Sequence, residues 1–298
     1  MRHIISIRDF SRRDLDYLLD RAEDFAAGGY DRNLLAGKIV ALLFFEPSTR
    51  TRMSFASAMA RLGGSSISVD SVEASSLAKG ETLADTIRVV SGYTDAIVLR
   101  HPKEGAARLA SEFAQVPVIN AGDGAGQHPS QTLLDLYTIR KSMDLDGLEM
   151  GILGDLRYGR TAHSLAYALS LYQVTLHTIA PRGLEFPEGL LNELHDRGME
   201  VKAHSDVREI IRDLDVLYIT RIQKERFPDL GSYYDVASSY RITPETLQGV
   251  KDRLILLHPL PRVDEIDPRV DSTPHARYFE QSRNGVPVRM ALLSEVMR

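Results

Sequence analysis

Residues 45–52 read Phe-Glu-Pro-Ser-Thr-Arg-Thr-Arg and bring hydroxyl and guanidinium groups together on one short turn. The turn follows the apolar run 39–45, which is typical of a buried parallel strand. A helical pattern begins at once, with Phe55, Met59 and Leu62 spaced to share one face. The first backbone N–H groups of a helix lack partners and lie at the positive end of its dipole, so such a turn can hold a phosphate.

Ser48, Thr49 and Thr51 can donate hydrogen bonds to an anion, and Arg50 and Arg52 can form forked, charge-assisted ones. An ordinary helix cap with surface arginines is the alternative, because Ser and Thr are common caps. Two arginines in the first helical turn nevertheless oppose the dipole and reduce stability unless an anion compensates them. The sequence therefore favours a phosphate site. It is not the glycine-rich loop of nucleotide hydrolases, because no Gly-Lys-Ser/Thr follows a strand.

The chain has 298 residues, a length suited to two domains, and its 43% hydrophobic and 26% charged residues are typical of a globular protein. It contains no cysteine, which excludes disulfides, a thiolate nucleophile and a cysteine-based zinc site. A net charge of −5 gives no overall attraction to nucleic acid, so any anion site must be local. No apolar run is long enough to cross a bilayer, and the N-terminus lacks the apolar core of a secretory signal. We expect a cytoplasmic protein with no membrane or nucleic-acid partner.

Strand and helix patterns alternate along the chain, which predicts the α/β class with two domains, each a parallel sheet flanked by helices. Strands are expected at 39–45, 66–69, 96–99 and 116–119, and then at 150–153, 174–179, 201–203, 216–219 and 254–257. The glycine-rich segment 122–126 and a following helix separate the two sets. We place one domain at 1–143 and another at 144–284, with a terminal helix at about 285–298 whose pattern does not tell which domain it packs on.

Ligands of open parallel sheets bind beyond the carboxyl ends of the strands. Arginine or histidine follows nearly every predicted strand, at Arg100-His101, at His128, from Arg157 to Arg160, from Arg221 to Lys224 and from His258 to Arg262. Random surface charge would include more carboxylates. The pattern therefore predicts a strongly anionic set of ligands, bound in a cleft between the domains.

His101, His128 and His258 are each followed by proline, which holds the backbone extended and suits a side chain aimed from a strand end. A structural role is the alternative for His101 and His258, whereas His128 follows three glycines and is the best functional candidate. No spacing places two histidines on one face, so we predict no metal site. The segment 151–156 lacks the G-x-G-x-x-G order of a dinucleotide site, so we predict no cofactor. Ser48 lacks the G-x-S-x-G surroundings of a nucleophile elbow, which argues against Ser48 as a catalytic nucleophile.

Five motifs, in order along nearly the whole chain, resemble those of the aspartate and ornithine carbamoyltransferases. Residues 46–52 are similar to the carbamoyl-phosphate signature, and residues 128–131, His-Pro-Ser-Gln, are similar to the family's H-P-x-Q motif. The segments 75–86, 221–226 and 258–262 resemble the aspartate branch. The ornithine branch has a His-Cys-Leu-Pro segment instead, and this chain has no cysteine.

The resemblance implies transfer of a carbamoyl group from carbamoyl phosphate to the α-amine of L-aspartate, the committed step of pyrimidine synthesis, without a cofactor. The residues implied to hold carbamoyl phosphate are Ser48, Thr49, Arg50, Thr51, Ser75, Arg100, His128, Gln131, Pro259 and Leu260. Those implied to hold aspartate are Lys79, Arg160, Arg221 and Gln223. Those implied in catalysis are Arg50, Thr51, Lys79, Arg100 and His128. Ser75 and Lys79 are expected from a neighbouring subunit, which implies a homotrimer with shared active sites, and separate regulatory chains are a further partner left open.

Two alternatives stay open. One is a carbamoyltransferase for another amino-acid acceptor, such as ornithine. The other is a catalytically silent scaffold or regulatory binding module built on the same fold. The presence of Arg50, Lys79, Arg100 and His128 argues against the silent module, because binding alone does not require a destabilising cationic cluster.

Overall fold

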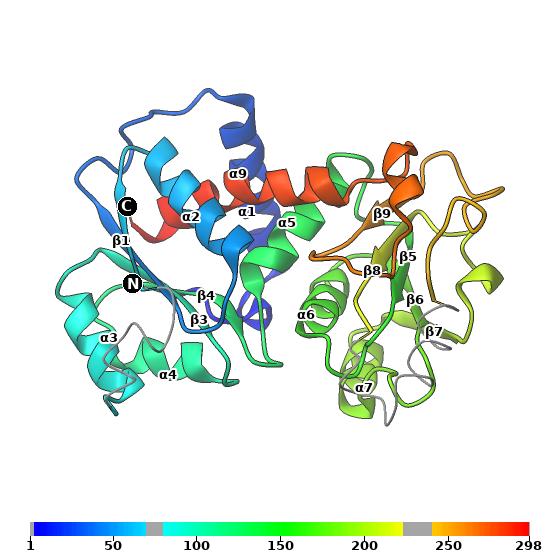
Figure 1. The fold of residues 1–298 in the computed structure, drawn as a ribbon, viewed down its shortest axis with the longest axis horizontal. Coiled ribbons are helices and arrows are strands. Elements are labelled where there is room, and N and C mark those ends of the chain that lie inside the picture. The colour runs from blue at the N-terminus through cyan, green and yellow to red at the C-terminus, as the bar shows by residue number, and fades with distance from the viewer. Residues whose placement is uncertain (1–2, 70–79, 223–239, 298) are drawn as a thin grey trace. The chain divides into compact units, whose positions relative to one another are not determined.

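The computed structural model describes residues 3–69, 80–222 and 240–297 (Figure 1). The chain forms two compact units, one of Met1–Tyr137 with Arg283–Arg298 and the other of Thr138–Ser282. The division falls inside two helices, α5 (Pro129–Arg140) and α9 (Tyr278–Val296). Each unit has its own sheet and its own buried core.

The first unit is built on a four-stranded parallel sheet in the order β2-β1-β3-β4. Its strands are β1 (Ile39–Phe44), β2 (Ser65–Val69), β3 (Ala96–His101) and β4 (Val118–Asp123), and its other helices are α1 (Arg12–Ala27), α2 (Thr49–Arg61), α3 (Leu83–Ser91) and α4 (Ala106–Phe113). On one face of the sheet, Ala41 and Leu43 of β1 share a buried cluster with Ile87 of α3 and Ala107 of α4. Figure 1 draws α2 on the other side of the sheet from α3 and α4.

The second unit has a five-stranded parallel sheet in the order β7-β6-β5-β8-β9. Its strands are β5 (Leu148–Leu153), β6 (Val174–Ile179), β7 (Glu200–His204), β8 (Val216–Ile219) and β9 (Ile255–Leu257), and its further helices are α6 (Arg160–Leu169) and α7 (Glu188–Asp196). Leu153, Leu217 and Leu256 from three strands meet Tyr278 in one buried cluster. The predicted α/β class, with two parallel sheets flanked by helices, is confirmed.

Strand β4 extends beyond the end that the sequence predicted, because it runs on to Asp123. The glycines that follow Asn120 suggested a break. The Asn120 side chain, however, donates to Asp123 Oδ1 at 2.9 Å and accepts from the Gly122 N–H at 2.8 Å. These local bonds hold the glycine-containing segment in an extended form.

Helix α9 begins at Tyr278, earlier than the predicted start at about 285, and contains Pro287. A proline inside a helix removes one backbone hydrogen bond and usually ends or bends the helix. Here the residues on both sides of it are buried, with Gln281, Val288 and Leu292 at most 3% exposed. Tertiary packing therefore outweighs the lost bond.

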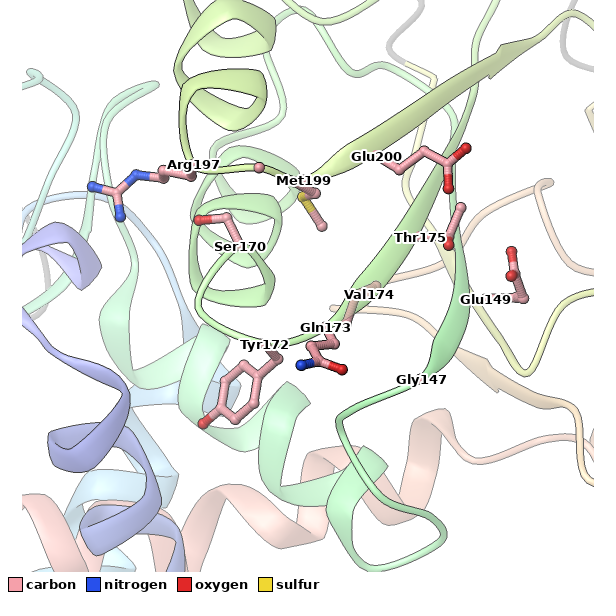
Figure 2. Close-up of a pocket in the computed structure, with 11 residues that line it drawn as sticks. Gly147, Glu149, Ser170, Tyr172, Gln173, Val174, Thr175, Arg197, Met199 and Glu200 are labelled. Carbon is pink, nitrogen blue, oxygen red and sulfur yellow. The ribbon is translucent and has the colours of Figure 1, made fainter.

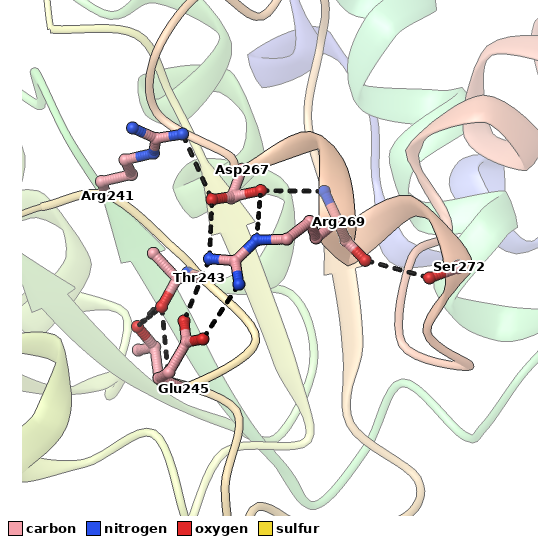
Figure 3. Close-up of polar contacts among 7 residues, drawn as sticks. Arg241, Thr243, Glu245, Asp267, Arg269 and Ser272 are labelled. Carbon is pink, nitrogen blue, oxygen red and sulfur yellow. Dashed lines mark hydrogen bonds and ion pairs between the residues drawn. The ribbon is translucent and has the colours of Figure 1, made fainter.

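A polar network joins two segments at the surface of the second unit (Figure 3). Asp267 accepts from the Arg269 backbone N–H at 2.9 Å, and its other oxygen accepts from the Arg241 and Arg269 side chains at 3.3 and 3.1 Å. Arg269 also donates to Glu245 at 3.1 and 3.3 Å. The Arg269 side chain, by its hydrogen bond, holds the pKa of Asp267 below its usual value. Exposed pairs such as Arg269 with Glu245 contribute little energy individually.

Asp215 is a buried counter-ion in the second sheet. Its side chain is fully buried and accepts from Lys251 Nζ at 2.7 Å, from Arg253 Nε at 2.8 Å and from the Glu149 N–H at 3.1 Å. Burial opposes the negative charge, but these donors outweigh burial and hold the pKa of Asp215 below its usual value. Since Asp215 precedes β8, Glu149 lies in β5 and the two cations precede β9, one carboxylate joins three neighbouring strands.

Asp215→Asn should lower the free energy of unfolding by about 3 kcal/mol at neutral pH, because two cations lose their buried counter-charge. The native pKa of Asp215 is depressed, so its contribution is present above the unfolded pKa of about 4 and is lost as the pH falls through the lower native pKa. Urea titrations of both proteins at neutral and acidic pH should show the difference shrinking in acid. Asp85→Asn, which removes an exposed partner of Arg88, is the control and should have little effect. A difference for Asp215→Asn that does not depend on pH would contradict this role.

Candidate active site

The predicted phosphate turn lies between β1 and α2. Ser48 is the N-cap of α2, yet its side chain makes no capping bond with any described residue, and the first helical turn contains no acid. Thr51 is buried, whereas Thr49 and Arg50 are exposed. Partial burial lowers the pKa of Arg50. The turn thus combines helix N–H groups with a guanidinium. Its one carboxylate, Glu46, lies before the helix and pairs with Arg100.

Arg100 lies at the same edge of the sheet. Phe44 and Arg100 are register partners, and the Phe45 N–H donates to the Arg100 carbonyl at 2.9 Å. The buried guanidinium donates from Nη1 to the Ala121 carbonyl at 3.1 Å and from Nη2 to Glu46 Oε1 at 2.5 Å. Glu46, to which the sequence analysis gave no role, is therefore the counter-ion that orients Arg100. A buried guanidinium without such a partner would be strongly destabilising.

A tight turn leads from β4 into α5. Gly124 has a φ of 52°, and a Cβ there would lie 2.7 Å from the Glu104 backbone nitrogen. Only glycine allows this close approach. His128 follows, and its carbonyl accepts from the N–H groups of Gln131 and Thr132 at 2.9 and 3.2 Å, which opens the helix. The buried His128 and Gln131 side chains thus lie within one helical turn of each other, directly after β4.

In the second unit, a glycine positions the loop that carries Arg160. Gly154 has a φ of 124°, and a Cβ there would lie 2.4 Å from both the carbonyl oxygen and Oγ1 of Thr220. The loop after β5 therefore approaches the end of β8, and Arg221 is the next residue after Thr220. Helix α6 begins at Arg160 with no acid in its first turn and no side-chain cap from Gly159. Arg160 and Arg221 thus follow neighbouring strands.

A buried histidine fixes the backbone after β9. Among the described residues, Leu260 is the only non-glycine residue with a positive φ, 53°. Its N–H donates to His258 Nδ1 at 2.8 Å, so the ring proton is on Nε2, which donates to Glu265 Oε1 at 2.7 Å. Burial would raise the pKa of Glu265, but the hydrogen bond from His258 keeps that pKa below its usual value. His258 therefore acts structurally and fixes the backbone of Pro259 and Leu260.

The predicted site residues fall into two groups at carboxyl ends of strands. In the first unit, the ends of β1, β3 and β4 carry Ser48, Thr49, Arg50, Thr51, Arg100, His128 and Gln131. In the second unit, the ends of β5, β8 and β9 carry Arg160, Arg221, Pro259 and Leu260. Ser75, Lys79 and Gln223 lie outside the described residues.

Within residues 3–69, 80–222 and 240–297, no group of three or more His, Cys, Asp or Glu side chains is arranged to hold a metal ion. Within the same ranges, no helix has both the length and the apolar character needed to span a membrane.

A pocket of about 440 Å³ opens at the other edge of the second sheet, where β5, β6 and β7 begin (Figure 2). It is lined by Gly147, Glu149, Ser170, Tyr172, Gln173, Val174, Thr175, Arg197, Gly198, Met199 and Glu200. Two carboxylates and one guanidinium give it no excess of positive charge for an anionic substrate. Its position at the amino ends of the strands also sets it apart from the candidate site.

Gly154→Ala should lower the melting temperature much more than Gly147→Ala. Both glycines have a positive φ, 124° at Gly154 and 78° at Gly147, so alanine strains the backbone by about 1–3 kcal/mol at either position. Only the methyl group at Gly154 would meet backbone, 2.4 Å from the Thr220 carbonyl oxygen, because nothing lies within 4 Å of the position at Gly147. Thermal melts of the two variants check this. Equal shifts would show that the approach to Thr220 does not restrict the loop.

Two family models match nearly the whole chain. Residues 2–141 match the carbamoyl-P binding domain of the aspartate/ornithine carbamoyltransferases. Residues 146–296 match the Asp/Orn binding domain of the same family. Both sets of strand-end residues therefore lie within matched regions.

Individual relatives are similar over their full length. The aspartate carbamoyltransferase catalytic subunit of Methanoculleus marisnigri is 78% identical over 298 residues, with 100% of each chain covered. The solved catalytic subunit of M. jannaschii aspartate transcarbamoylase is 51% identical with a TM-score of 0.94, over 100% of this chain and 98% of that one. The Trypanosoma cruzi aspartate transcarbamoylase solved with N-(phosphonacetyl)-L-aspartic acid is 40% identical with a TM-score of 0.92, over 100% and 96%. This chain belongs to the aspartate/ornithine carbamoyltransferase family.

Proposed function

We propose that this chain transfers the carbamoyl group of carbamoyl phosphate to the α-amine of L-aspartate, giving N-carbamoyl-L-aspartate and phosphate. The observation that carries the proposal is the turn before α2, where the family's phosphate signature opens a helix with no acid in its first turn. The chain is a transferase whose relatives at 78% and 68% identity are aspartate carbamoyltransferase catalytic subunits. Its reaction is the committed step of pyrimidine (UMP) biosynthesis.

The side chains proposed to recognise carbamoyl phosphate come from the first unit, and the backbone of Pro259 and Leu260 in the second unit adds to them. The phosphate is held by Ser48, Thr49, Arg50 and Thr51, the carbonyl oxygen by Thr49, Arg100 and His128, and the carbamoyl amide by Gln131 with the backbone of Pro259 and Leu260. Support for this assignment comes from the uncapped start of α2 and from the ion pair that orients Arg100. Charge-assisted hydrogen bonds from these donors suit a phosphate dianion.

The second unit supplies the groups that recognise aspartate. Arg160 binds the α-carboxylate, and Arg221 with Gln223 binds the β-carboxylate. The position of both arginines just beyond neighbouring strands supports this assignment. We accordingly assign carbamoyl-phosphate binding to residues 1–143 and aspartate binding to 144–284. The C-terminal residues 283–298 pack with the first unit.

The chemistry needs positioning and electrostatics, without a covalent intermediate. The neutral amine of aspartate attacks the carbonyl carbon, and Arg100 and His128 stabilise the tetrahedral oxyanion as its charge develops. The carbon–oxygen bond to phosphate then breaks, phosphate leaves into the cradle formed by residues 48–51, and phosphate accepts the amine proton. Holding the two substrates in contact can supply about 7–11 kcal/mol of the barrier reduction. Cationic side chains also offset the repulsion between two dianionic substrates.

Ser75 and Lys79 reach the active site from a neighbouring subunit, so the working unit is a cytoplasmic homotrimer with shared sites. The support for this proposal is the likeness of residues 75–86 to the lysine-bearing loop of the aspartate branch. Regulatory chains are a further possible partner of such a trimer. Light scattering on the purified protein measures the assembly, and a monomer that is fully active would refute the shared site.

The purified chain should carbamoylate L-aspartate and leave ornithine unchanged. Arg221 is a cation suited to a β-carboxylate, whereas the side-chain amine of ornithine would face like charge there. A colorimetric assay for carbamoyl amino acids, run with both acceptors and carbamoyl phosphate, checks this. Omission of each substrate in turn is the control. Carbamoylation of ornithine would contradict the assignment of aspartate as the acceptor. Release of phosphate when both acceptors are absent would contradict the transfer reaction.

Arg50→Ala and Lys79→Ala should each lower kcat by about 10²–10³-fold, because each removes a cation that stabilises developing charge. Mixing the two inactive proteins under conditions that exchange subunits should restore part of the activity, since some shared sites then regain both residues. Arg61→Ala, at the other end of α2, is the matched control and should keep its activity. Thermal melts confirm folding. No recovery despite demonstrated exchange would contradict sharing, and a fully active Arg50→Ala protein would contradict the phosphate assignment.

A further inference from the structure

We propose that Asp135 orients the side-chain amide of Gln131 so that its carbonyl oxygen faces the carbamoyl nitrogen of the substrate, and that the buried cation of Arg289 is the counter-charge of Asp135. Asp135 and Arg289 are then positioning residues that act through Gln131. This inference rests on the proposed function and deepens it, because it identifies how the site recognises the amide end of carbamoyl phosphate. All three residues belong to the first unit.

The contact between Gln131 and Asp135 determines the direction of the amide. The residues are four apart on α5, so they share one face, and Gln131 Nε2 donates to Asp135 Oδ1 at 2.8 Å. An ionised carboxylate offers only acceptors, so it takes the NH₂ end of the amide and leaves Gln131 Oε1 for another partner. A carbamoyl NH₂ group offers only donors. The reversed amide would place one NH₂ group against another and lose the hydrogen bond to the substrate.

Arg289 supplies the charge that balances Asp135. Its guanidinium, on α9, is 3% exposed, donates to Ser54 Oγ at 2.9 Å and lies 5.1 Å from the centre of the Phe55 ring. Burial lowers the pKa of Arg289 to about 10, and the charge of Asp135 opposes that shift, so Arg289 stays cationic at neutral pH. A fully buried cation and a fully buried carboxylate each need an opposite charge. Arg289 therefore favours the ionised, acceptor-only form of Asp135 on which the direction of the amide depends.

Gly285 leaves space for the Arg289 guanidinium because glycine has no Cβ. A Cβ at Gly285, one turn earlier on α9, would lie 2.2 Å from Arg289 Nη1 and 3.3 Å from Leu134 Cδ2. Ser54 and Phe55 lie on α2, one turn after the residues proposed to hold phosphate. Arg289 thus contacts α2, the helix that follows the phosphate turn. Its proposed counter-ion, Asp135, contacts Gln131, the residue proposed to bind the carbamoyl amide.

The first test distinguishes binding of the carbamoyl end of the substrate from binding of its phosphate end. Asp135→Asn keeps the shape of the side chain but can accept or donate, so the Gln131 amide is free to reverse. Loss of a directed hydrogen bond should raise the KM and the Kd of carbamoyl phosphate about tenfold. Competitive inhibition by inorganic phosphate should be unchanged, because residues 48–51 are untouched. Asp215→Asn, an equally buried carboxylate change in the second unit, is the control and should alter neither constant when assayed well below its melting temperature.

A double-mutant cycle tests whether Asp135 acts through Gln131. In a Gln131→Ala background, Asp135→Asn should have no further effect on the Kd of carbamoyl phosphate. Should Asp135→Asn fail to fold with its unpaired cation, the charge-neutral pair Asp135→Asn with Arg289→Met removes both buried charges and should show the same selective loss. Additive effects in the cycle, or equal losses of affinity for phosphate and carbamoyl phosphate, would overturn the inference. A wild-type protein that transfers no carbamoyl group would instead refute the proposed function itself.

Discussion

The mutual repulsion of two small dianions is the constraint on which the arrangement of this chain depends. Helices α2 and α6, one in each unit, both begin with arginine in or beside a first turn that has neither an acid nor a side-chain cap from the described residues. Each start is unfavourable for an isolated helix, since unpaired N–H groups and guanidiniums accumulate positive charge. An anionic ligand removes that penalty. The unfavourable interactions at these helix starts are relieved when the ligand binds, and this relief adds to the binding free energy.

Hydrogen bonds to carboxylates control the direction in which polar groups of the proposed site point. Arg100 is tied to Glu46 and to the carbonyl of Ala121, and the Gln131 amide is tied to Asp135. In each case a donor in the proposed site is held by an acceptor of the protein. Such bonds are formed before the ligand arrives, so no reorganisation is needed at the moment of reaction. Asp215 uses the same interaction for a different purpose, because its partners hold strands together.

The sequence predicted the features that depend on local pattern, and it missed those that depend on packing. The alternation of strands and helices gave the two parallel sheets, and the strand-end rule found Arg100, Arg160 and Arg221. Pro287 misled the prediction of α9, because burial of the neighbouring turns outweighs a local helix breaker. Glu46 was read as part of a motif without a role, since its partner is distant in sequence and is brought close only by the register of β1 and β3.

The order of synthesis has a consequence for how this chain folds. Residues 138–282 are contiguous and form one unit, whereas the other unit needs both residues 1–137 and residues 283–298. Domains generally fold in the order in which they leave the ribosome. Here the first unit begins first but is completed last, because the part of α9 that contains Arg289 is synthesised only after all of residues 138–282. Until then Asp135 lacks the cation proposed to balance it, so the first unit stays incomplete while residues 138–282 are translated.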